Sequence, residues 1–311
     1  MRRVVIAHGG TASKPDMKDG TDAAVEAGMK LLDKGPLEAV VAAVMVLEDD
    51  ERFNAGTGSN FCFDGLTIEM DAAVMDSRKQ YGAVSGIRRA KNPVKIARAL
   101  VDTPNHILGG DGADAFARKL GFPEYDPRTS RAKKKWEEAI EQIKNGEDGV
   151  EDNEWDYETL KECWNYERPF EDVFGKKPWA PRKKEGKRFW SSDTVGAVAT
   201  DGRTFASATS TGGTLTTLLG RIGDTPNIGT GIFAGECGAV AVTGNGDHIL
   251  RERVSTMIHK WMADGMSAQA SVRRLTASFK DTTDVWACVI DLTDYAGGGN
   301  RDIAWSVAEE T

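Results

Sequence analysis

A threonine stands at a sharp change of character in the sequence, and its position suggests a nucleophile. The stretch "RFWSSDTVGAVATDGR" (residues 188–203) is polar up to Asp193, and apolar residues follow Thr194. Cleavage of the 193–194 bond would make Thr194 an N-terminal residue. Its α-amine, with a pKa near 7.7–8, could then act as a base toward its own hydroxyl. The alternative interpretation is that Thr194 only starts a strand, for which threonine is well suited.

Three glycine-containing segments after Thr194 supply groups that such a nucleophile needs. "TSTGG" (209–213) is rich in hydroxyls, and its glycines allow close approach of a ligand or of backbone. In "GRIGDTP" (220–226), Arg221 suits an α-carboxylate and Asp224 an α-ammonium, although a simple loop salt bridge is the alternative. "TGNGD" (243–247) offers backbone N–H groups in a turn, which suit an oxyanion.

The second half of the chain has the pattern of strands joined by tight turns. The apolar runs "TVGAVAT" and "TFASATS" flank Asp201-Gly202, which predicts a hairpin. "AGECGAVAVTGNGD" predicts a strand that ends in a glycine loop. Residues 248–265 and 267–279 have helical patterns. "DVWACVIDLTD" and "IAWSVAE" are expected to form a terminal antiparallel pair.

The first half mixes the same two kinds of element. "RVVIAHGG" predicts a strand, and residues 19–50 predict two helices broken at Gly35-Pro36. "LTIEMDAAVMDS" alternates weakly, "YGAVSGIRRA" predicts a strand, and helices are expected over "PVKIARALVD" and "GADAFARKLGF". The order of elements predicts an α+β fold in which helices cover antiparallel sheets.

The stretch from 123 to 187 differs from the rest in being dense in charges of both signs. Its first part could form a solvated helix, and the remainder has too few aliphatic residues to predict a core. "KKPWAPRKKEGKR" is typical of a mobile linker. The tryptophans of this stretch could form a binding surface, but local packing is the simpler interpretation; they are Trp136, Trp155, Trp164 and Trp179.

Composition excludes several classes of partner. The 311 residues carry a formal net charge of −8, which disfavours nucleic acid because phosphate binding needs a basic face. No apolar run approaches the ~18 residues that span a bilayer, and the short apolar run of "MRRVVIAHGG" is not typical of a signal peptide. The four scattered cysteines favour free thiols and a cytoplasmic protein.

The motifs together resemble one family. D-T-V-G-A-V, T-S-T-G-G, G-R-I-G-D-T-P and T-G-N-G-D follow one another at the spacing of the plant-type asparaginase, isoaspartyl peptidase and glycosylasparaginase group of N-terminal-nucleophile hydrolases. In the first half, "HGG", "LEDDERFNAGTGS", "EMDAAVMD", "GAVSGIRRAKNP" and "GADAFARKLGF" are also similar to it. The resemblance covers about residues 3–122 and 189–260; residues 123–187 do not match, and the last thirty residues match poorly.

The resemblance implies a single domain over 1–311 with a four-layer αββα fold. It implies autocatalytic cleavage before Thr194, which gives an α-chain of 1–193 and a β-chain of 194–311, and a homodimer of such αβ units. The implied substrates are L-asparagine and β-aspartyl dipeptides. No cofactor is expected beyond a structural sodium ion. It would be bound through the backbone of a loop comprising Leu47, Glu48, Asp50, Phe53, Ala55 and Thr57.

The resemblance also implies roles for single residues. Thr194 is the nucleophile, Thr211 supports its hydroxyl, and Asp193 assists the cleavage as a base. Thr243 and Gly244 form the oxyanion hole. The groups near the substrate are Arg221, Asp224, Gly244, Gly246 and Asn54.

Some features leave alternatives open. Asp193-Thr194 and "TGNGD" are closer to glycosylasparaginases, whereas Gly212 stands where those tend to carry Asn. A threonine endopeptidase would need an uncharged residue in place of Asp224. An uncleaved amino-acid-binding or interaction protein is the alternative from a different class. His8 is expected to be structural, and Glu69 with Asp71 to mark a strand edge rather than an acid pair.

Overall fold

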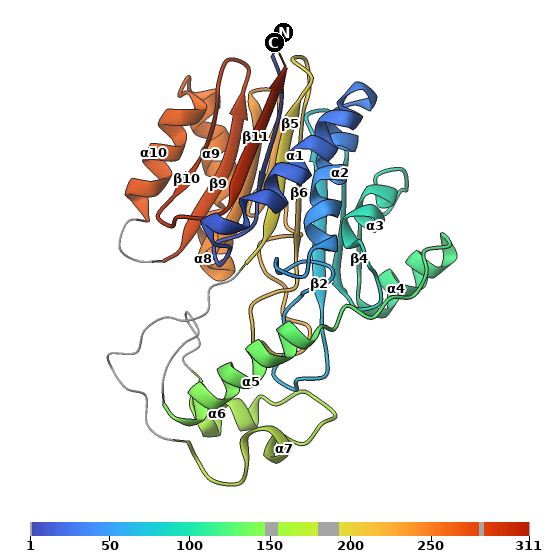
Figure 1. Ribbon diagram of the computed structural model, residues 1–311, viewed down its shortest axis with the longest axis vertical. Helices are drawn as coiled ribbons and strands as arrows, with labels where there is room; N and C mark the ends of the chain where they lie inside the picture. The colour runs from blue at the N-terminus through green and yellow to red at the C-terminus, as the bar shows by residue number, and fades with distance from the viewer. Residues whose placement is uncertain (1, 147–154, 180–192, 280–282, 311) are drawn as a thin grey trace.

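The larger of two β-sheets holds the predicted nucleophile at the start of one of its central strands. The computed structural model describes residues 2–146, 155–179, 193–279 and 283–310. The strand order of this sheet is β11-β1-β5-β6-β2-β3-β4, and only β3 and β4 pair in parallel (Figure 1). Its strands are β1 (Arg3–His8), β2 (Met70–Asp76), β3 (Tyr81–Ile87), β4 (Ile107–Gly109), β5 (Val195–Thr200), β6 (Phe205–Thr211) and β11 (Trp305–Glu310).

The smaller sheet is antiparallel and has the order β10-β9-β8-β7. Its strands are β7 (Ile232–Gly235), β8 (Gly238–Gly244), β9 (Val285–Asp291) and β10 (Tyr295–Gly299). The two sheets share an apolar cluster that includes Val198 of β5, Ala241 of β8 and Cys288 of β9. The inner faces of the two sheets are therefore packed against each other.

Helices cover the outer face of each sheet (Figure 1). Alternate residues of β5, such as Ala197 and Ala199, point away from the second sheet into a cluster with helices α1 (Lys18–Leu31), α2 (Pro36–Asp49) and α3 (Pro93–Leu100). On the smaller sheet, a third cluster joins β8 and β9 to the other helices of the second half. These are α8 (Gly246–Glu252), α9 (Val254–Ala263) and α10 (Ala268–Ser278).

Several sequence predictions are confirmed. Helices α1 and α2 are separated at Gly35, whose φ of 115° favours glycine, and Pro36 opens α2. The β5–β6 hairpin turns at Asp201-Gly202, where the Asp201 carboxylate accepts the N–H groups of Arg203 and Thr204. The expected helix before residue 122 is α4 (Gly110–Lys119).

The expected terminal antiparallel pair is wrong. Strand β9 pairs with β8 and β10, and β11 pairs with β1 in the other sheet. Strand β10 escapes a search for β-branched runs because its sequence is "YAGGG". Its glycines are required by packing: a Cβ at Gly297 would lie 2.6 Å from the Trp286 ring, and one at Gly299 would lie 2.0 Å from the carbonyl oxygen of Val285.

The described part of the segment from 123 to 187 is folded and packs on the larger sheet's cluster. It contains α5 (Ser130–Lys144), α6 (Tyr157–Glu162) and α7 (Phe170–Phe174). The core that aliphatic residues could not supply is aromatic, since Tyr157, Phe170 and Phe174 are buried with Trp164 and Trp179 around them. The tryptophans therefore pack locally, and most of "KKPWAPRKKEGKR" lies outside the described residues.

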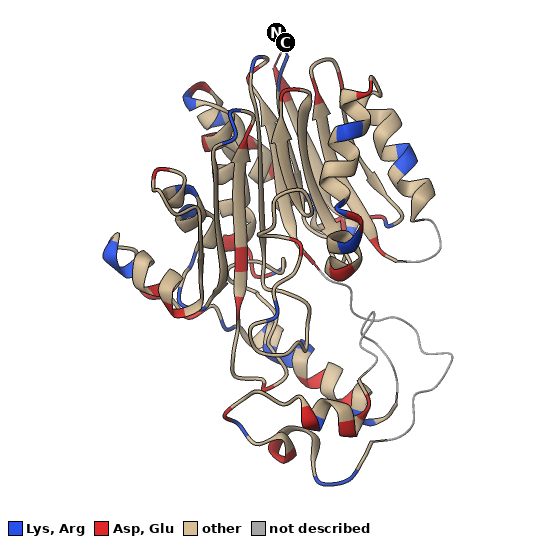
Figure 2. Cartoon of the chain, turned by 180° about the vertical axis from the view of Figure 1, so that it is seen from behind, with Lys and Arg blue, Asp and Glu red and all other residues tan. Residues whose placement is uncertain are grey.

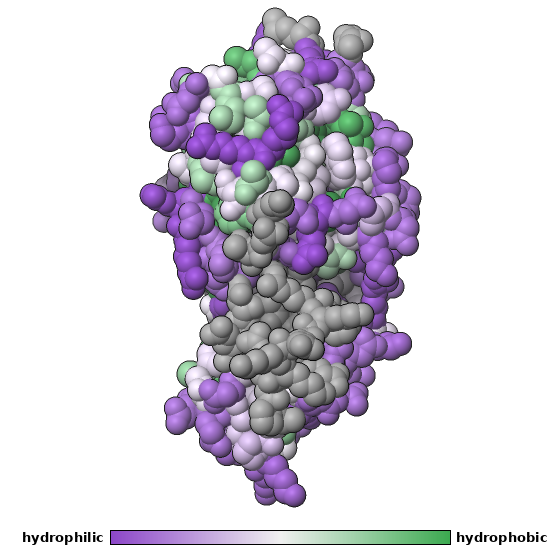
Figure 3. Space-filling view, turned by 90° about the vertical axis from the view of Figure 1, so that its left-hand side faces the viewer, coloured by the Kyte–Doolittle hydropathy of each residue, from purple (hydrophilic) through white to green (hydrophobic). Residues whose placement is uncertain are grey.

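Charge follows the architecture. Lys, Arg, Asp and Glu lie mainly on helices and loops, and few lie on the strands (Figure 2). The face in Figure 3 is mostly hydrophilic, with apolar residues in small patches. Within the described ranges, no helix is long and apolar enough to cross a membrane.

Candidate active site

The Asp193–Thr194 peptide lies buried at the start of β5, on the side of the sheet that faces β8. Asp193 and Thr194 are 6% and 3% exposed. The position follows from strand alternation: Thr194 shares a face with Gly196 and Val198, and Val198 packs between the sheets. Thr194, which the sequence places where a polar stretch meets an apolar strand, therefore lies between the two sheets.

Two side chains bind the carbonyl oxygen of Asp193. The Asn54 Nδ2 donates to it at 2.9 Å, and the Thr211 Oγ1 donates at 2.6 Å. A second bond from Asn54 Nδ2 to the Gly213 carbonyl (2.8 Å) and one from Asn60 N to Asn54 Oδ1 (2.8 Å) fix the orientation of the amide. Two donors at one carbonyl polarise it toward attack by a nucleophile.

The Asp193 side chain is also buried. Its Oδ1 accepts the backbone N–H of Ala12. Burial raises the pKa of Asp193 to about 6, although the ammonium of Lys135 and the Ala12 N–H oppose the rise. A carboxyl group with this pKa is largely ionised at pH 7 and can still accept a proton.

Thr194 itself contacts two further threonines. Its Oγ1 lies 3.0 Å from the Oγ1 of Thr225, and its backbone N donates to the Oγ1 of Thr243 at 3.1 Å. The family resemblance implied that Thr211 contacts the Thr194 hydroxyl, but the described hydroxyl partner is Thr225. Sequence reasoning missed Thr225, although it stands directly after Asp224 in the "GRIGDTP" segment. A hydrogen bond from Thr209 Oγ1 to the Thr225 carbonyl (3.1 Å) ties this segment to β6.

Arg221 and Asp224 meet beside Gly246. A Cβ at Gly246 would lie 2.9 Å from both Arg221 Nη2 and Asp224 Oδ1, so the glycine leaves room next to both charges. Arg221 also pairs with Asp247 at 3.2 Å. A cation and an anion at one position match the α-carboxylate and α-ammonium of an amino acid.

The Asp224 carboxyl group is buried, and its surroundings shift its pKa. Burial raises its pKa to about 7, and the Arg221 guanidinium opposes the rise. Its Oδ2 has no hydrogen-bond partner among the described residues. A buried acceptor without a partner is costly, which is expected where a ligand supplies the partner.

Gly244, the other residue expected at the oxyanion, ends β8 with a φ of 143°. A Cβ there would lie 2.1 Å from the carbonyl oxygen of Asp284, so this position requires glycine. Glu69 and Asp71 do not form an acid pair: Glu69 pairs with Arg88 at 2.9 Å, and Asp71 accepts the Gly86 N–H at 2.8 Å.

In the loop expected to hold a sodium ion, backbone carbonyls approach two glycines, and Glu48 and Phe53 are the expected ligands among them. A Cβ at Gly58 would lie 2.6 and 2.7 Å from the carbonyl oxygens of Glu51 and Phe53, and one at Gly56 would lie 2.5 Å from that of Glu48. The described residues contain no cluster of His, Cys, Asp and Glu that could hold a metal ion.

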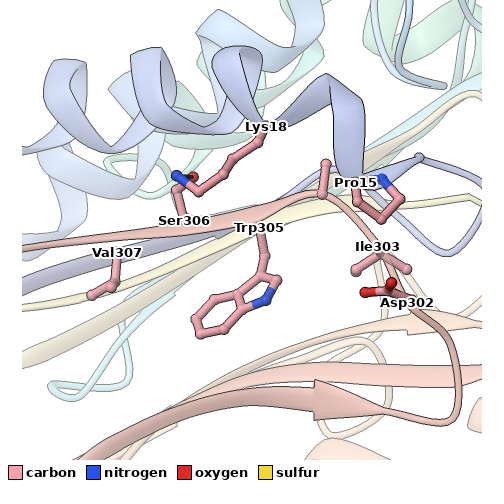
Figure 4. A pocket seen from close by; sticks show the side chains of 8 residues that line it. Pro15, Lys18, Asp302, Ile303, Trp305, Ser306 and Val307 are labelled. Atoms are coloured by element: carbon pink, nitrogen blue, oxygen red, sulfur yellow. Dashed lines mark hydrogen bonds between the residues drawn. The ribbon is translucent and has the colours of Figure 1, made fainter.

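A pocket of about 360 Å³ lies away from these residues, between the start of α1 and β11. Figure 4 shows Lys18 and Ser306 on one side of β11 and the Trp305 ring on the other side, where it packs near Trp286. None of its lining residues was predicted to have a functional role.

Comparison with known proteins decides the family. The model of the asparaginase family matches residues 1–299. The chain belongs to the asparaginase family. The match includes the segment from 123 to 187 and most of the C-terminal region, which is more than the sequence motifs suggested.

Two groups of relatives from this family are similar to the chain. The "Plant-type L-asparaginase" of Pyrococcus horikoshii is 38% identical over 86% of this chain and 82% of its own length. The "Isoaspartyl peptidase/L-asparaginase" of Danio rerio is 32% identical over 100% of this chain and 93% of its own length. That of Mus musculus is 36% identical over 82% of this chain and 71% of its own.

His8, expected to be structural, is buried without described hydrogen bonds, and this burial should make the stability of the fold depend on pH. It is fully buried at the end of β1, next to Trp286, and neither ring nitrogen has a described partner. Burial lowers its pKa to about 3. The unfolded chain binds a proton near pH 6.5 that the folded chain does not. Stability should therefore fall as pH drops from 6.5 toward 3, by up to about 1.4 kcal/mol per pH unit.

We expect His8→Phe to remove this part of the acid sensitivity. Urea unfolding at pH 7 and pH 5 measures it, in a Thr194→Ala background so that every protein is a single chain. His106→Phe, at an exposed position, is the control and should keep the wild-type difference between the two pH values. An unchanged pH dependence in His8→Phe would contradict the assignment.

Proposed function

We propose that this protein is a self-cleaving threonine amidohydrolase. It would hydrolyse the side-chain amide of L-asparagine to L-aspartate and ammonia, and also β-aspartyl dipeptides. The observation that carries the proposal is the buried 193–194 peptide, whose carbonyl accepts two side-chain donors and whose threonine has polar partners at both its N and its Oγ1. The names of the relatives support the two substrate classes. The packing of helices, sheet, sheet and helices supports the four-layer αββα arrangement of N-terminal-nucleophile hydrolases.

Self-cleavage would begin with an N→O acyl shift. The Thr194 Oγ1 attacks the carbonyl carbon of Asp193, a C–O bond forms, the C–N bond breaks, and the hydroxyl proton reaches the released amine through the Asp193 carboxylate. Asn54 and Thr211 stabilise the negative charge on the carbonyl oxygen. Water then hydrolyses the ester, which leaves a carboxylate on Asp193 and a free α-amine on Thr194.

The cleaved enzyme would use the same hydroxyl on substrate. Arg221 and Asp224 bind the α-carboxylate and α-ammonium, which fixes the side-chain carbonyl near Thr194. The α-amine takes the hydroxyl proton and returns it to the leaving amine. Thr243 and the backbone of Gly244 stabilise the oxyanion, and Thr225 orients the attacking hydroxyl. Water completes the cycle by hydrolysing the β-aspartyl ester.

A sodium ion bound in the 47–58 loop would stabilise the site. The backbone carbonyls of the 47–58 loop offer the hard oxygen donors that such cations take. Two of the expected ligands, the carbonyls of Glu48 and Asp50, each accept one backbone N–H, from Thr57 and Phe53, and each retains a second lone pair. The ion would fix the loop that presents Asn54. We further propose that the active form is a homodimer of αβ units.

Gly212 favours the asparaginase over the glycosylasparaginase interpretation. A Cβ at this position would lie 2.3 Å from Ser59 Cβ and 2.6 Å from Asn54 Oδ1. The asparagine that glycosylasparaginases tend to carry there would therefore displace Asn54 from the Asp193 carbonyl.

We expect Gly212→Ala to slow self-cleavage at least tenfold, because loss of one carbonyl donor typically costs ~10²–10³ in rate. The fraction of cleaved chain over time, measured on a denaturing gel, gives the effect. Gly112→Ala is the matched control, because a Cβ there meets nothing within 4 Å. Cleavage of Gly212→Ala at the wild-type rate would contradict the described contact.

Substrate turnover tests the proposed function. The cleaved protein is assayed with L-asparagine, a β-aspartyl dipeptide and N-glycosylated asparagine. Turnover of the first two supports the proposal. Turnover of the glycosylated substrate alone would establish the glycosylasparaginase alternative, and binding of amino acids without turnover would favour the non-catalytic alternative.

A further inference from the structure

Helix α5 is held firmly against the loop that carries Asn54 and Asn60. Thr129 caps the helix by accepting the Ala132 N–H at 3.0 Å. The Trp136 ring packs on Gly65, where a Cβ would lie only 2.5 Å from the ring, and Lys133 Nζ donates to the Gly65 carbonyl at 2.9 Å. Figure 1 shows α5 beyond the ends of the sheet strands, between the sheet and α6.

Lys135 of this helix is joined to the Asp193 carbonyl by a chain of hydrogen bonds. Its Nζ donates to Asn60 Oδ1 at 3.1 Å, and Asn60 Nδ2 donates to the Gly213 carbonyl at 3.0 Å. The backbone N of Asn60 donates to Asn54 Oδ1, and Asn54 Nδ2 donates to the Asp193 carbonyl. Because Lys135 fixes the amide of Asn60, it supports the donor at the bond to be cut.

The same lysine also acts on the Asp193 carboxylate. Its charge opposes the rise in pKa that burial imposes on Asp193, whereas Asp284 adds to the rise. Asp284 is itself paired with Arg301, which weakens its effect. On the other side, burial lowers the pKa of Lys135, and the carboxylate of Asp193 opposes this while Arg131 adds to it. Among the described residues, the charged groups that act on this pair are thus Asp284, which is paired with Arg301, and Arg131; within the pair, Lys135 is the cation that stabilises ionised Asp193.

We propose that Lys135 is a positioning residue for self-cleavage, supplied by the charged segment (residues 123–187) that precedes the cleaved bond in the sequence. Docking of α5 orients Asn60 and Asn54 on the Asp193 carbonyl and keeps the Asp193 carboxylate ionised as the proton acceptor. The segment is then more than a linker, because it activates in cis the reaction that separates the two chains. This inference rests on the proposed self-cleavage.

The test compares Lys135→Met, Lys135→Arg and the control Lys134→Met, a neighbouring lysine on the exposed side of α5. Each chain is synthesised by in vitro translation, and its conversion to two fragments is followed from pH 5 to pH 9. We expect Lys135→Met to slow conversion at least tenfold and to move the acid limb of the rate to higher pH by about one unit, since loss of the cation raises the pKa of Asp193. Lys135→Arg should stay within a few-fold of wild type, and Lys134→Met should match it.

The position of the acid limb decides the outcome. If Lys135 only stabilised the fold, Lys135→Met would lower the melting temperature but leave the acid limb where it is in the wild type. An unshifted limb overturns the proposal at any rate of conversion, and so does an arginine variant as impaired as the methionine variant. If the wild-type chain is never cut, it is instead the proposed self-cleavage that fails.

Discussion

Thr194→Ala should give a single chain that is never cut and has no hydrolase activity. The variant removes the hydroxyl of the proposed nucleophile from a site where Asn54 and Thr211 bind the Asp193 carbonyl oxygen. The variant leaves the two donors to the carbonyl in place, so a loss of cleavage would report the missing nucleophile alone. In enzymes with an activated hydroxyl, removal of the nucleophile costs ~10⁶ in kcat, and we expect a loss of at least ~10⁴ here.

Denaturing mass spectrometry of purified protein measures the cleavage. Wild type should give fragments of residues 1–193 and 194–311 whose masses add up to the 33.7 kDa chain plus one water molecule. Thr194→Ser, which keeps a hydroxyl, should be cut more slowly. Thr200→Ala, at the other end of β5, should be cut like wild type. Fragments from Thr194→Ala would show that some other nucleophile cuts the bond.

The features that the sequence predicted correctly depend on local signals. The β5–β6 hairpin follows from alternation around Asp201-Gly202, and the α1–α2 break follows from Gly35-Pro36. The site residues could be proposed because they stand in short motifs. Asn54, Thr211 and Thr243 are brought to the 193–194 peptide although they come from three separate segments.

The features that sequence reasoning missed are non-local. Which strand pairs with β9 depends on distant partners, and the glycines of β10 make sense only beside the Trp286 ring. The charged pattern of α5 suggested a solvated helix. Alternation of charge could not show that Trp136 would be buried or that Lys135 would reach Asn60. Thr225 stands in the 220–226 motif, but its contact with Thr194 depends on where that segment lies in the fold.

Asp224→Asn should greatly weaken productive binding of amino-acid substrates while leaving self-cleavage intact. The carboxyl group is 3% exposed, and its Oδ2 has no described partner. Removing one partner of a buried charge pair costs about 2–5 kcal/mol, which is roughly 30- to 4,000-fold in kcat/KM. Asparagine is nearly isosteric with aspartate, so the fall in kcat/KM measures the effect of removing the charge. The substrate-binding groups take no part in the acyl shift, so two fragments should still form.

The pH dependence of kcat/KM gives a second and independent readout. The raised pKa of Asp224, about 7, means that the group is protonated below that pH and can no longer pair with an ammonium. The Thr194 α-amine, with an expected pKa near 7.7–8, must also lose its proton to act as a base. On the acid side, the kcat/KM of the wild type should therefore fall through the uptake of two protons, one by Asp224 and one by the Thr194 α-amine. The kcat/KM of Asp224→Asn should fall through the uptake of one proton.

The control for this variant is Asp302→Asn, which removes the same charge at an exposed position. It should keep the wild-type kcat/KM and the two-proton limb. If Asp224→Asn turns over asparagine within a few-fold of wild type, the α-ammonium is bound elsewhere. A large loss confined to KM, with normal self-cleavage, would place Asp224 on the substrate and leave Thr194 as the reacting group in both reactions.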